Sequence, residues 1–249
     1  MAKIRLDKFI ANGGVYTRSQ AKKLIHTKKV AVNGDIVTDE GFKVDETCED
    51  ITVNGINVTA EKYIYIMLNK PAGVISATED KMQKTVLDLI SPEDSRNGLA
   101  PVGRLDIDTE GLLILTNDGA FAHDTLSPKK HVSKLYYALV TGYTYSEESK
   151  ARFLNGIVLT DGYICKSAVL TLVENRKDCT AVTLEITEGK FHQVKKMFET
   201  EGGKVIYLKR LSFGDIKLDD TLKSGEYRRL NEKEMQFVSK IKTRYGENV

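Results

Sequence analysis

Three carboxylates lie close together in one short segment of the sequence, the stretch GRLDIDTEG, as Asp106, Asp108 and Glu110. The segment leads directly into an apolar run at residues 112–115, which predicts a buried strand. Loops that a rigid strand holds in place carry catalytic groups more often than other segments do. A carboxylate at such a place can act as a covalent nucleophile or as a general acid or base.

Other uses of the same acids have to be weighed. The pattern D-x-D-x-E-G resembles the start of a calcium-binding loop, but such a loop needs a bidentate glutamate at its twelfth position, which here is Asn117. A pair of carboxylates can also hydrolyse a glycosidic bond, and the spacing alone leaves this chemistry open. The simplest alternative is that the acids only solvate a loop.

Positive charge is concentrated in the first 34 residues, although the formal net charge of the whole chain is only +2. This concentration predicts a polyanionic partner, and a solvated basic face without a partner is the alternative. Against the single acid Asp7, the segment holds Lys3, Arg5, Lys8, Arg18, Lys22, Lys23, Lys28 and Lys29.

The composition is that of an ordinary globular protein, with 41% hydrophobic and 29% charged residues. No apolar run approaches the roughly 20 residues of a membrane helix, and the N-terminus lacks a secretory hydrophobic segment. We therefore expect a cytoplasmic protein without a membrane partner. The three cysteines, Cys48, Cys165 and Cys179, are dispersed, which argues against a disulfide framework and against a zinc site.

Local patterns predict two short helices and two hairpins at the N-terminus, followed by a larger part in which strands dominate. Leu6, Phe9 and Ile10 follow helical spacing, and TRSQ at 17–20 fits a capping box that starts a second helix. Asn-Gly pairs within 30–37 and 53–58 predict tight hairpins. Further strands are expected at 63–68, 112–115, 135–141, 168–173 and 180–186, and helices at 85–89, 146–153 and 193–200. Strands mixed with a few helices, without regular βαβ alternation, predict an α+β fold.

Residues 4–50, with RLDKFIAN and YTRSQAKKLIHTKKVAVNG, resemble an S4 RNA-binding domain. In that family the paired helices and the first loop contact the RNA backbone, so the resemblance implies that the polyanionic partner is RNA. We expect an S4-like domain at residues 1–60 and a second, catalytic domain at residues 61–249, built on a mixed, mainly antiparallel sheet with flanking helices.

Five further motifs follow in a fixed order: NKPAG at 69–73, GRLDIDTEGLLILTNDG at 103–119, KLYYALV at 134–140, EGKFHQVKKMF at 188–198 and GEYR at 225–228. Together they resemble the pseudouridine synthases. The resemblance is closest to the branch that carries an N-terminal S4 domain and modifies small-subunit ribosomal RNA.

The resemblance implies a role for four residues. Asp106 matches the aspartate that attacks the target uridine, and Arg104 matches an arginine that helps to hold the flipped-out RNA. Tyr136 matches a tyrosine that stacks on the uracil ring and takes part in proton removal from C5. Lys195 stands where many relatives have an arginine paired with the aspartate. The reaction needs no cofactor and no metal.

The resemblance also implies a partner, namely ribosomal RNA or an assembling 30S particle, with a uridine-516-type site of 16S RNA as the target and a monomeric enzyme. A 23S enzyme and a non-catalytic rRNA-binding assembly factor are the alternatives. His192 is interpreted as shaping its loop, with acid/base catalysis as the alternative, and Lys70 as either a surface residue or part of the site entrance. Expected RNA contacts of the S4-like domain are Arg5, Lys8, Arg18, Lys22, Lys23, Lys28 and Lys29.

Overall fold

The computed structural model describes residues 3–45, 50–58, 63–92, 94–95, 98–127 and 130–246, with only the backbone described for 244–246. The chain divides into two compact units. The first comprises Met1–Tyr65, Ile90–Ala100 and Thr116–Asp118, and the second comprises Ile66–Leu89, Pro101–Leu115 and Gly119–Val249. Cys48 lies outside the described residues. None of the described helices is both long enough and apolar enough to cross a membrane.

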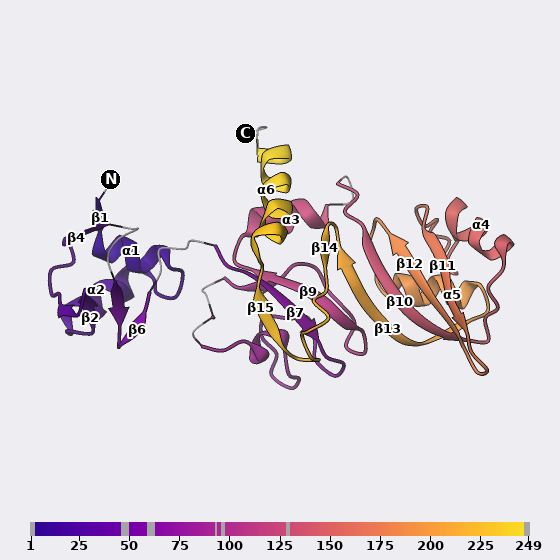
Figure 1. Cartoon of the computed structure of the whole chain (residues 1–249), viewed down its shortest axis with the longest axis horizontal. Helices are drawn as coiled ribbons and strands as arrows, with labels where there is room; N and C mark the ends of the chain where they lie inside the picture. The colour runs from indigo at the N-terminus through magenta and orange to yellow at the C-terminus, as the bar shows by residue number, and fades with distance from the viewer. Residues whose placement is uncertain are drawn as a thin grey trace. The chain divides into compact units, whose positions relative to one another are not determined.

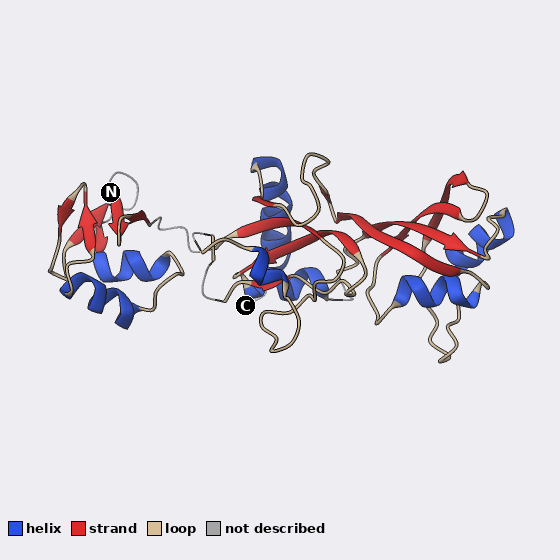
Figure 2. Cartoon of the chain, turned by 90° about the horizontal axis from the view of Figure 1, so that it is seen from below, coloured by secondary structure: helices blue, strands red, loops and turns tan. Residues whose placement is uncertain are grey.

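Short strands and two helices make up the N-terminal part of the first unit. Figure 2 shows the two helices on one side of the strands. Thr17 caps the second helix, since its hydroxyl accepts from the backbone N–H of Gln20 while the Gln20 side chain accepts from the N–H of Thr17. The elements are β1 (Lys3–Arg5), α1 (Leu6–Asn12), α2 (Arg18–His26), β2 (Val30–Val32), β3 (Asp35–Ile36), β4 (Lys43–Asp45), β5 (Ile51–Val53) and β6 (Ile56–Asn57).

The core of this part explains the apolar spacing of the sequence. Leu6, Phe9 and Ile10 of α1 are buried against Ala21 and Ile25 of α2. Two Asn-Gly turns join the strand pairs β2–β3 and β5–β6, and in each turn both residues have positive φ, as a tight two-residue hairpin requires. Strands β2 and β5 then pair antiparallel, so the two hairpins form one four-stranded sheet.

A twisted, mostly antiparallel sheet forms the frame of the second unit (Figure 1). Its strand order is β11-β12-β10-β13-β9-β7-β15, with β14 paired to β13 and β8 paired to β9. The β13–β9 contact is parallel, whereas the other described strand pairs of this order with a printed register are antiparallel. The strands are β7 (Tyr65–Lys70), β8 (Ala100–Pro101), β9 (Glu110–Thr116), β10 (Lys134–Thr141), β11 (Val169–Asn175), β12 (Thr180–Ile186), β13 (Lys204–Phe213), β14 (Ile216–Lys217) and β15 (Tyr227–Arg229).

Helices cover this sheet in two places. Helix α4 (Glu147–Asn155) contacts β11, and α5 (Gln193–Thr200) contacts β13. Helix α3 (Gly119–Leu126) packs beside α6 (Glu232–Gly246), where the rings of Phe121 and Phe237 meet edge to face at 6.3 Å between their centroids. A short 3-10 turn, η1, spans Val86–Leu89. Strand β9 is buried along almost its whole length, so the loop that precedes it is attached to the core.

The predicted α+β class and the S4-like architecture followed by a mixed, mainly antiparallel sheet are confirmed. Strand β12 and helix α5 have the predicted bounds, whereas the strand expected at 63–68 begins two residues later, at Tyr65. The segment 85–89 is a 3-10 turn and not a full helix. Helix α2 ends at His26, so Lys28 and Lys29 follow the helix and do not lie on its face. Elements β13, α3 and α6 had not been predicted.

Candidate active site

The loop that carries Asp106 is held from beneath by a buried lysine. Lys70, at the end of β7, is fully buried, and its ammonium donates to the carbonyl oxygens of Pro71 at 2.9 Å, Thr109 at 2.9 Å and Ile107 at 3.4 Å. The interpretation of Lys70 as a surface residue is therefore wrong. Burial lowers the pKa of Lys70 to about 8, although the carboxylates of Asp108, Glu110 and Asp106 act in the opposite direction.

Further contacts fix the backbone on both sides of Asp106. The Ser76 hydroxyl exchanges hydrogen bonds with Leu105, accepting from its N–H at 3.0 Å and donating to its carbonyl at 2.9 Å. Gly111 lies opposite Arg210 where β9 meets β13, with φ of +96°. A Cβ at Gly111 would collide with the Arg210 carbonyl, so only glycine permits this approach of the two strands.

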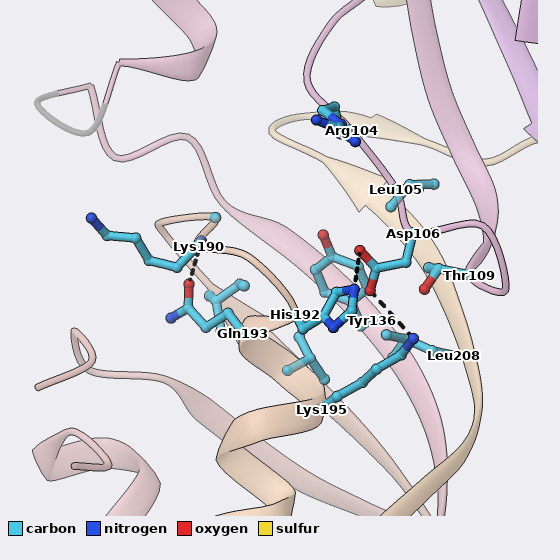
Figure 3. Close-up of a pocket in the computed structure, with 13 residues that line it drawn as sticks. Arg104, Leu105, Asp106, Thr109, Tyr136, Lys190, His192, Gln193, Lys195 and Leu208 are labelled. Carbon is cyan, nitrogen blue, oxygen red and sulfur yellow. Dashed lines mark hydrogen bonds and ion pairs between the residues drawn. The ribbon is translucent and has the colours of Figure 1, made fainter. Parts of the chain in front are cut away.

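Asp106, Tyr136, His192 and Lys195 line one pocket (Figure 3). One carboxylate oxygen of Asp106 lies 3.3 Å from the Lys195 ammonium, and the other lies 3.5 Å from Nε2 of His192. The Asp106 side chain keeps 25% of its surface exposed, so a ligand in the pocket can reach it. The four residues come from three places in the sequence, which the fold brings together.

Lys195 also holds a second carboxylate. Its ammonium donates to Asp108 at 2.6 Å, a shorter contact than the one with Asp106. This hydrogen bond is the main reason why the pKa of Asp108 lies below its usual value. The two aspartates of the loop therefore share one cation, an arrangement that the sequence analysis did not anticipate.

Tyr136 forms one wall of the pocket. It lies on β10, whose residues alternate between buried and half-buried, and its side chain is almost buried among Leu105, Val194 and Leu208 of the lining. Tyr137 on the other face is only half-buried and contacts the ring of Tyr207. Tyr137 is therefore the less buried of the two tyrosines.

The stretch EGKFHQVK positions the other wall. Gln193, buried at the start of α5, accepts from the N–H of Lys190 at 2.9 Å and donates to Glu188, whose carboxylate also accepts from the N–H of Lys166. These bonds fold residues 188–192 into a tight loop. His192 ends it in the left-handed region with φ of 53°, and its ring stacks on Phe191 at 3.7 Å between centroids. The contact with Asp106 makes His192 part of the pocket. An acid/base role for His192, the alternative to the loop-shaping interpretation, stays a prediction.

Comparisons with known proteins identify the family of this chain. Residues 64–200 match the family described as RNA pseudouridylate synthase, and residues 4–49 match the S4 domain. The chain belongs to the RNA pseudouridine synthase family. Enzymes of this family isomerise uridine in RNA to pseudouridine, and all four pocket residues lie within the matched segment.

Individual relatives match this pseudouridine synthase over nearly its whole length. It is 41% identical over 234 residues to the ribosomal large subunit pseudouridine synthase B of Bacillus subtilis, covering 93% of this chain and 94% of that protein. It is 38% identical over 239 residues to the ribosomal small subunit pseudouridine synthase A of Haemophilus influenzae, covering 95% and 100%. A crystal structure of a pseudouridylate synthase shares 36% identity with a TM-score of 0.63, covering 94% of this chain and 99% of that one.

The expected RNA contacts of the S4 domain fall into two groups. Arg5 and Arg18 both bind the buried carboxylate of Asp7, at 3.0 and 3.2 Å, and Lys22 binds Glu40 at 2.9 Å. His26 also contacts Glu40, at 3.3 Å. The second group has no ion pair with any described residue and consists of Lys8, Lys23, Lys28 and Lys29.

Two further expectations concern Arg104 and metals. Arg104 is exposed and lines the pocket beside Asp106, without an ion pair to the described residues.

The described part of the chain contains no group of three or more histidine, cysteine or acidic side chains that could hold a metal ion. The free Cys165 is buried, and burial raises the pKa of its thiol to about 11, so it behaves as a core side chain.

Proposed function

We propose that this enzyme isomerises one uridine of small-subunit ribosomal RNA, with Asp106 as the covalent nucleophile. The observation that carries the proposal is the pairing of Asp106 with Lys195 in a pocket walled by Tyr136. A partly exposed carboxylate beside a cation and an aromatic ring suits attack on an extruded nucleotide.

The reaction rearranges bonds without any net addition. The C1′–N1 bond breaks, the uracil turns, and C1′ joins C5, while C5 loses a proton and N1 ends with one. Asp106 forms a covalent bond to the nucleotide and is released again when the product is complete. The chemistry consumes neither a reductant nor a second substrate, so we propose that no cofactor and no metal take part.

The neighbouring side chains fit this mechanism. Lys195 places a positive charge 3.3 Å from the Asp106 carboxylate, where it can hold this carboxylate in position for attack. The ring of Tyr136 offers a stacking face for the uracil, and a base must leave the helical stack before any side chain can reach it. Arg104, exposed at the rim of the pocket, is placed to hold a phosphate of the extruded strand.

Capture of the RNA is proposed to begin on the S4 domain. We place this module at residues 1–60 and the catalytic domain at 61–249, acting as a monomer. Lysines that form no ion pair with a described residue can neutralise RNA phosphates, so Lys8, Lys23, Lys28 and Lys29 are the favoured contacts. Arg5, Arg18 and Lys22 already neutralise Asp7 and Glu40, and we assign them a structural role first.

Two observations support small-subunit RNA as the substrate. The segment KKMF at 195–198 resembles the small-subunit branch, and the Haemophilus small-subunit enzyme is matched over its full length. The large-subunit enzyme of Bacillus subtilis is 41% identical, which supports large-subunit RNA as the second candidate.

Pseudouridine mapping of both ribosomal RNAs tests the proposal. RNA from cells with and without the gene is labelled with carbodiimide and read by primer extension. Loss of one pseudouridine from the small-subunit RNA is the expected result. Loss from the large-subunit RNA instead would keep the reaction and change the substrate. Unchanged maps would contradict a ribosomal target and would favour a non-catalytic assembly factor if purified enzyme is also inactive on both RNAs.

A further inference from the structure

Two buried cations line a groove that adjoins the catalytic pocket. The groove has a volume of about 620 Å³ and shares Asp106, Tyr136 and His192 with that pocket. Its lining continues to Lys134 on β10 and Arg210 on β13, which the mechanism above does not use. Only 7% of Lys134 and 3% of Arg210 is exposed.

The protein satisfies these two cations only in part. The Lys134 ammonium donates to the Val132 carbonyl at 2.8 Å, and Nε of Arg210 donates to the Leu112 carbonyl at 2.7 Å. Both charges also lie against the ring of Phe213, at 5.5 and 5.4 Å from its centroid. Nη2 of Arg210 is buried and has no hydrogen-bond partner among the described residues.

Within the described part of the chain, no direct ion pair compensates the charge of these two cations. Neither Lys134 nor Arg210 forms an ion pair with a described acidic residue. Glu188 is near enough to act on Lys134, but its oxygens are held by Tyr163, Gln193 and the N–H of Lys166. Burial, with a smaller contribution from Arg210, lowers the pKa of Lys134 to about 8.

Two like charges buried together without an anion are costly for a folded protein. A buried cation left partly unsatisfied calls for a charged partner that arrives from outside, and the cation–aromatic contacts with Phe213 offset only part of the cost. The groove that both residues line is open to a ligand at Asp106, so the missing anion has a route to them.

We infer that Lys134 and Arg210 form a phosphate-binding subsite, which takes a backbone phosphate of the RNA strand whose uridine enters the Asp106 pocket. The inference rests on the proposed binding of RNA in this pocket. A phosphate is the anion that such a strand brings, and two cations at one place suit its charge. The subsite would fix the position of the strand and would leave the chemistry at Asp106 to the other residues.

The variant Lys134→Met tests the inference, with Lys204→Met as a control of equal charge change at an exposed position on β13. Pyrophosphate serves as the probe for the subsite, and transcripts of both ribosomal RNAs serve as the substrates. In the wild type and the control, pyrophosphate should raise the melting temperature, because it binds only the folded protein. Lys134→Met should lose this shift.

RNA binding by the same variants gives the second measurement. Lys134→Met should weaken RNA binding about tenfold at moderate salt and reduce the slope of log affinity against log salt by about one. The control Lys204→Met should keep both the RNA affinity and the turnover of bound RNA near the wild-type values. Without ligand, Lys134→Met should be no less stable than the wild type, since it removes an uncompensated charge. A purely structural lysine would instead lower the melting temperature and leave the salt slope unchanged, which would overturn the inference.

A measurement on the unaltered protein covers the case in which the variant does not fold. With lysine labelled for NMR, the Lys134 side chain should titrate at a higher pH once pyrophosphate is added, and an unchanged titration would overturn the inference. Failure of the proposed function looks different. In that case the wild type would isomerise neither RNA, while the pyrophosphate effects at Lys134 would persist.

Discussion

The Lys195 ammonium lies 3.3 Å from the nearer carboxylate oxygen of Asp106. Lys195 is in the first turn of α5, and Asp106 is in the loop before β9. Two segments almost ninety positions apart in the sequence thus supply the anion and the cation of one pair. Because both side chains are about a quarter exposed, the pair is neither sealed in the core nor fully screened by water. Substitutions at the pair should therefore change activity much more than stability.

Replacing Asp106 by asparagine should abolish pseudouridine formation and leave RNA binding intact. The amide keeps the size of the side chain but cannot act as the nucleophile, so the rate should fall by more than about 10³-fold. Release of tritium from RNA labelled at C5 of uridine measures the rate, and filter binding measures the affinity. Activity near the wild-type level would remove Asp106 from the mechanism. The melting temperature, measured in parallel, should change little at this partly exposed site.

Lys195 should matter more for turnover than its neighbour Asp108 does. Lys195→Met removes the ammonium that contacts both aspartates, and we expect a loss of about tenfold to a hundredfold in the rate at which bound substrate reacts. Lys195→Arg keeps the charge and should restore most of the activity. Asp108→Asn leaves Lys195 paired with Asp106 alone and should change the rate by less than about threefold. Single-turnover kinetics with saturating enzyme separates these effects from binding. Equal losses in Lys195→Met and Asp108→Asn would contradict the roles assigned here.

Substitutions in the two groups of basic S4 residues should have different effects, one group on RNA binding and the other on the stability of the domain. Lys23→Gln, Lys28→Gln and Lys29→Gln together should weaken RNA binding and reduce the salt slope by about two to three, with little effect on the melting temperature. Arg18→Gln serves as the matched control, because Arg18 holds the buried carboxylate of Asp7 at 3.2 Å. Because Arg5 still binds Asp7 and the Arg18 side chain is largely exposed, its loss should destabilise the domain by about 1 kcal/mol or less.

The ion pairs of Asp7 with Arg5 and Arg18 also predict that the stability of the S4 domain depends on pH. Hydrogen bonds from Arg5, and next from Arg18, hold the pKa of Asp7 below its usual value. The pair therefore stabilises the fold above the pKa of an unfolded aspartate, and this contribution is lost as the pH falls through the lower pKa of the folded state. Denaturant unfolding at several acidic pH values should show less pH dependence for Arg18→Gln than for the wild type. The same dependence in both proteins would show that Arg18 does not act on Asp7.

Local sequence signals predicted the elements whose geometry is set within a few residues. The Asn33-Gly34 and Asn54-Gly55 turns and the Thr17 capping box are of this kind, because positive φ and cap hydrogen bonds depend on neighbouring residues. Strand β13 was not predicted although residues 205–208 form a short apolar run, because such a run alone does not distinguish a strand from a buried helical segment. Its contacts with β10 and β9 come from distant parts of the chain.

The candidate site was predictable only as far as its motifs. Asp106, Tyr136 and Lys195 were identified from a family resemblance, and the fold then brings all three to one pocket. The shared use of Lys195 by two aspartates and the buried position of Lys70 depend on tertiary packing, which no local pattern records. A lysine before a proline gives no local sign that its ammonium will find three carbonyl partners in the core.

Lys70 should anchor the Asp106 loop. Lys70→Met should therefore lower activity through the position of this loop, although Lys70 itself does not contact the substrate. The substitution leaves the carbonyls of Pro71, Ile107 and Thr109 without this donor, so the loop should lose its fixed position. Misplacement of a catalytic group by a fraction of an ångström to an ångström costs about tenfold to a hundredfold in rate. Lys81→Met, at an exposed position, is the control.

The stabilities of the wild type and of Lys70→Met should also respond differently to alkaline pH. The pKa of Lys70 is about 8 in the folded protein and 10.5 for an ordinary lysine, so the unfolded chain binds more protons between these values. Stability of the wild type relative to Lys70→Met should therefore rise from pH 8 to 10.5, by on the order of 3 kcal/mol at most. Both proteins retain Lys134, whose pKa is also about 8, so its contribution cancels in the comparison. Unfolding by urea at each pH measures the difference, and parallel curves for the two proteins would mean that the Lys70 ammonium is not buried as a charged donor.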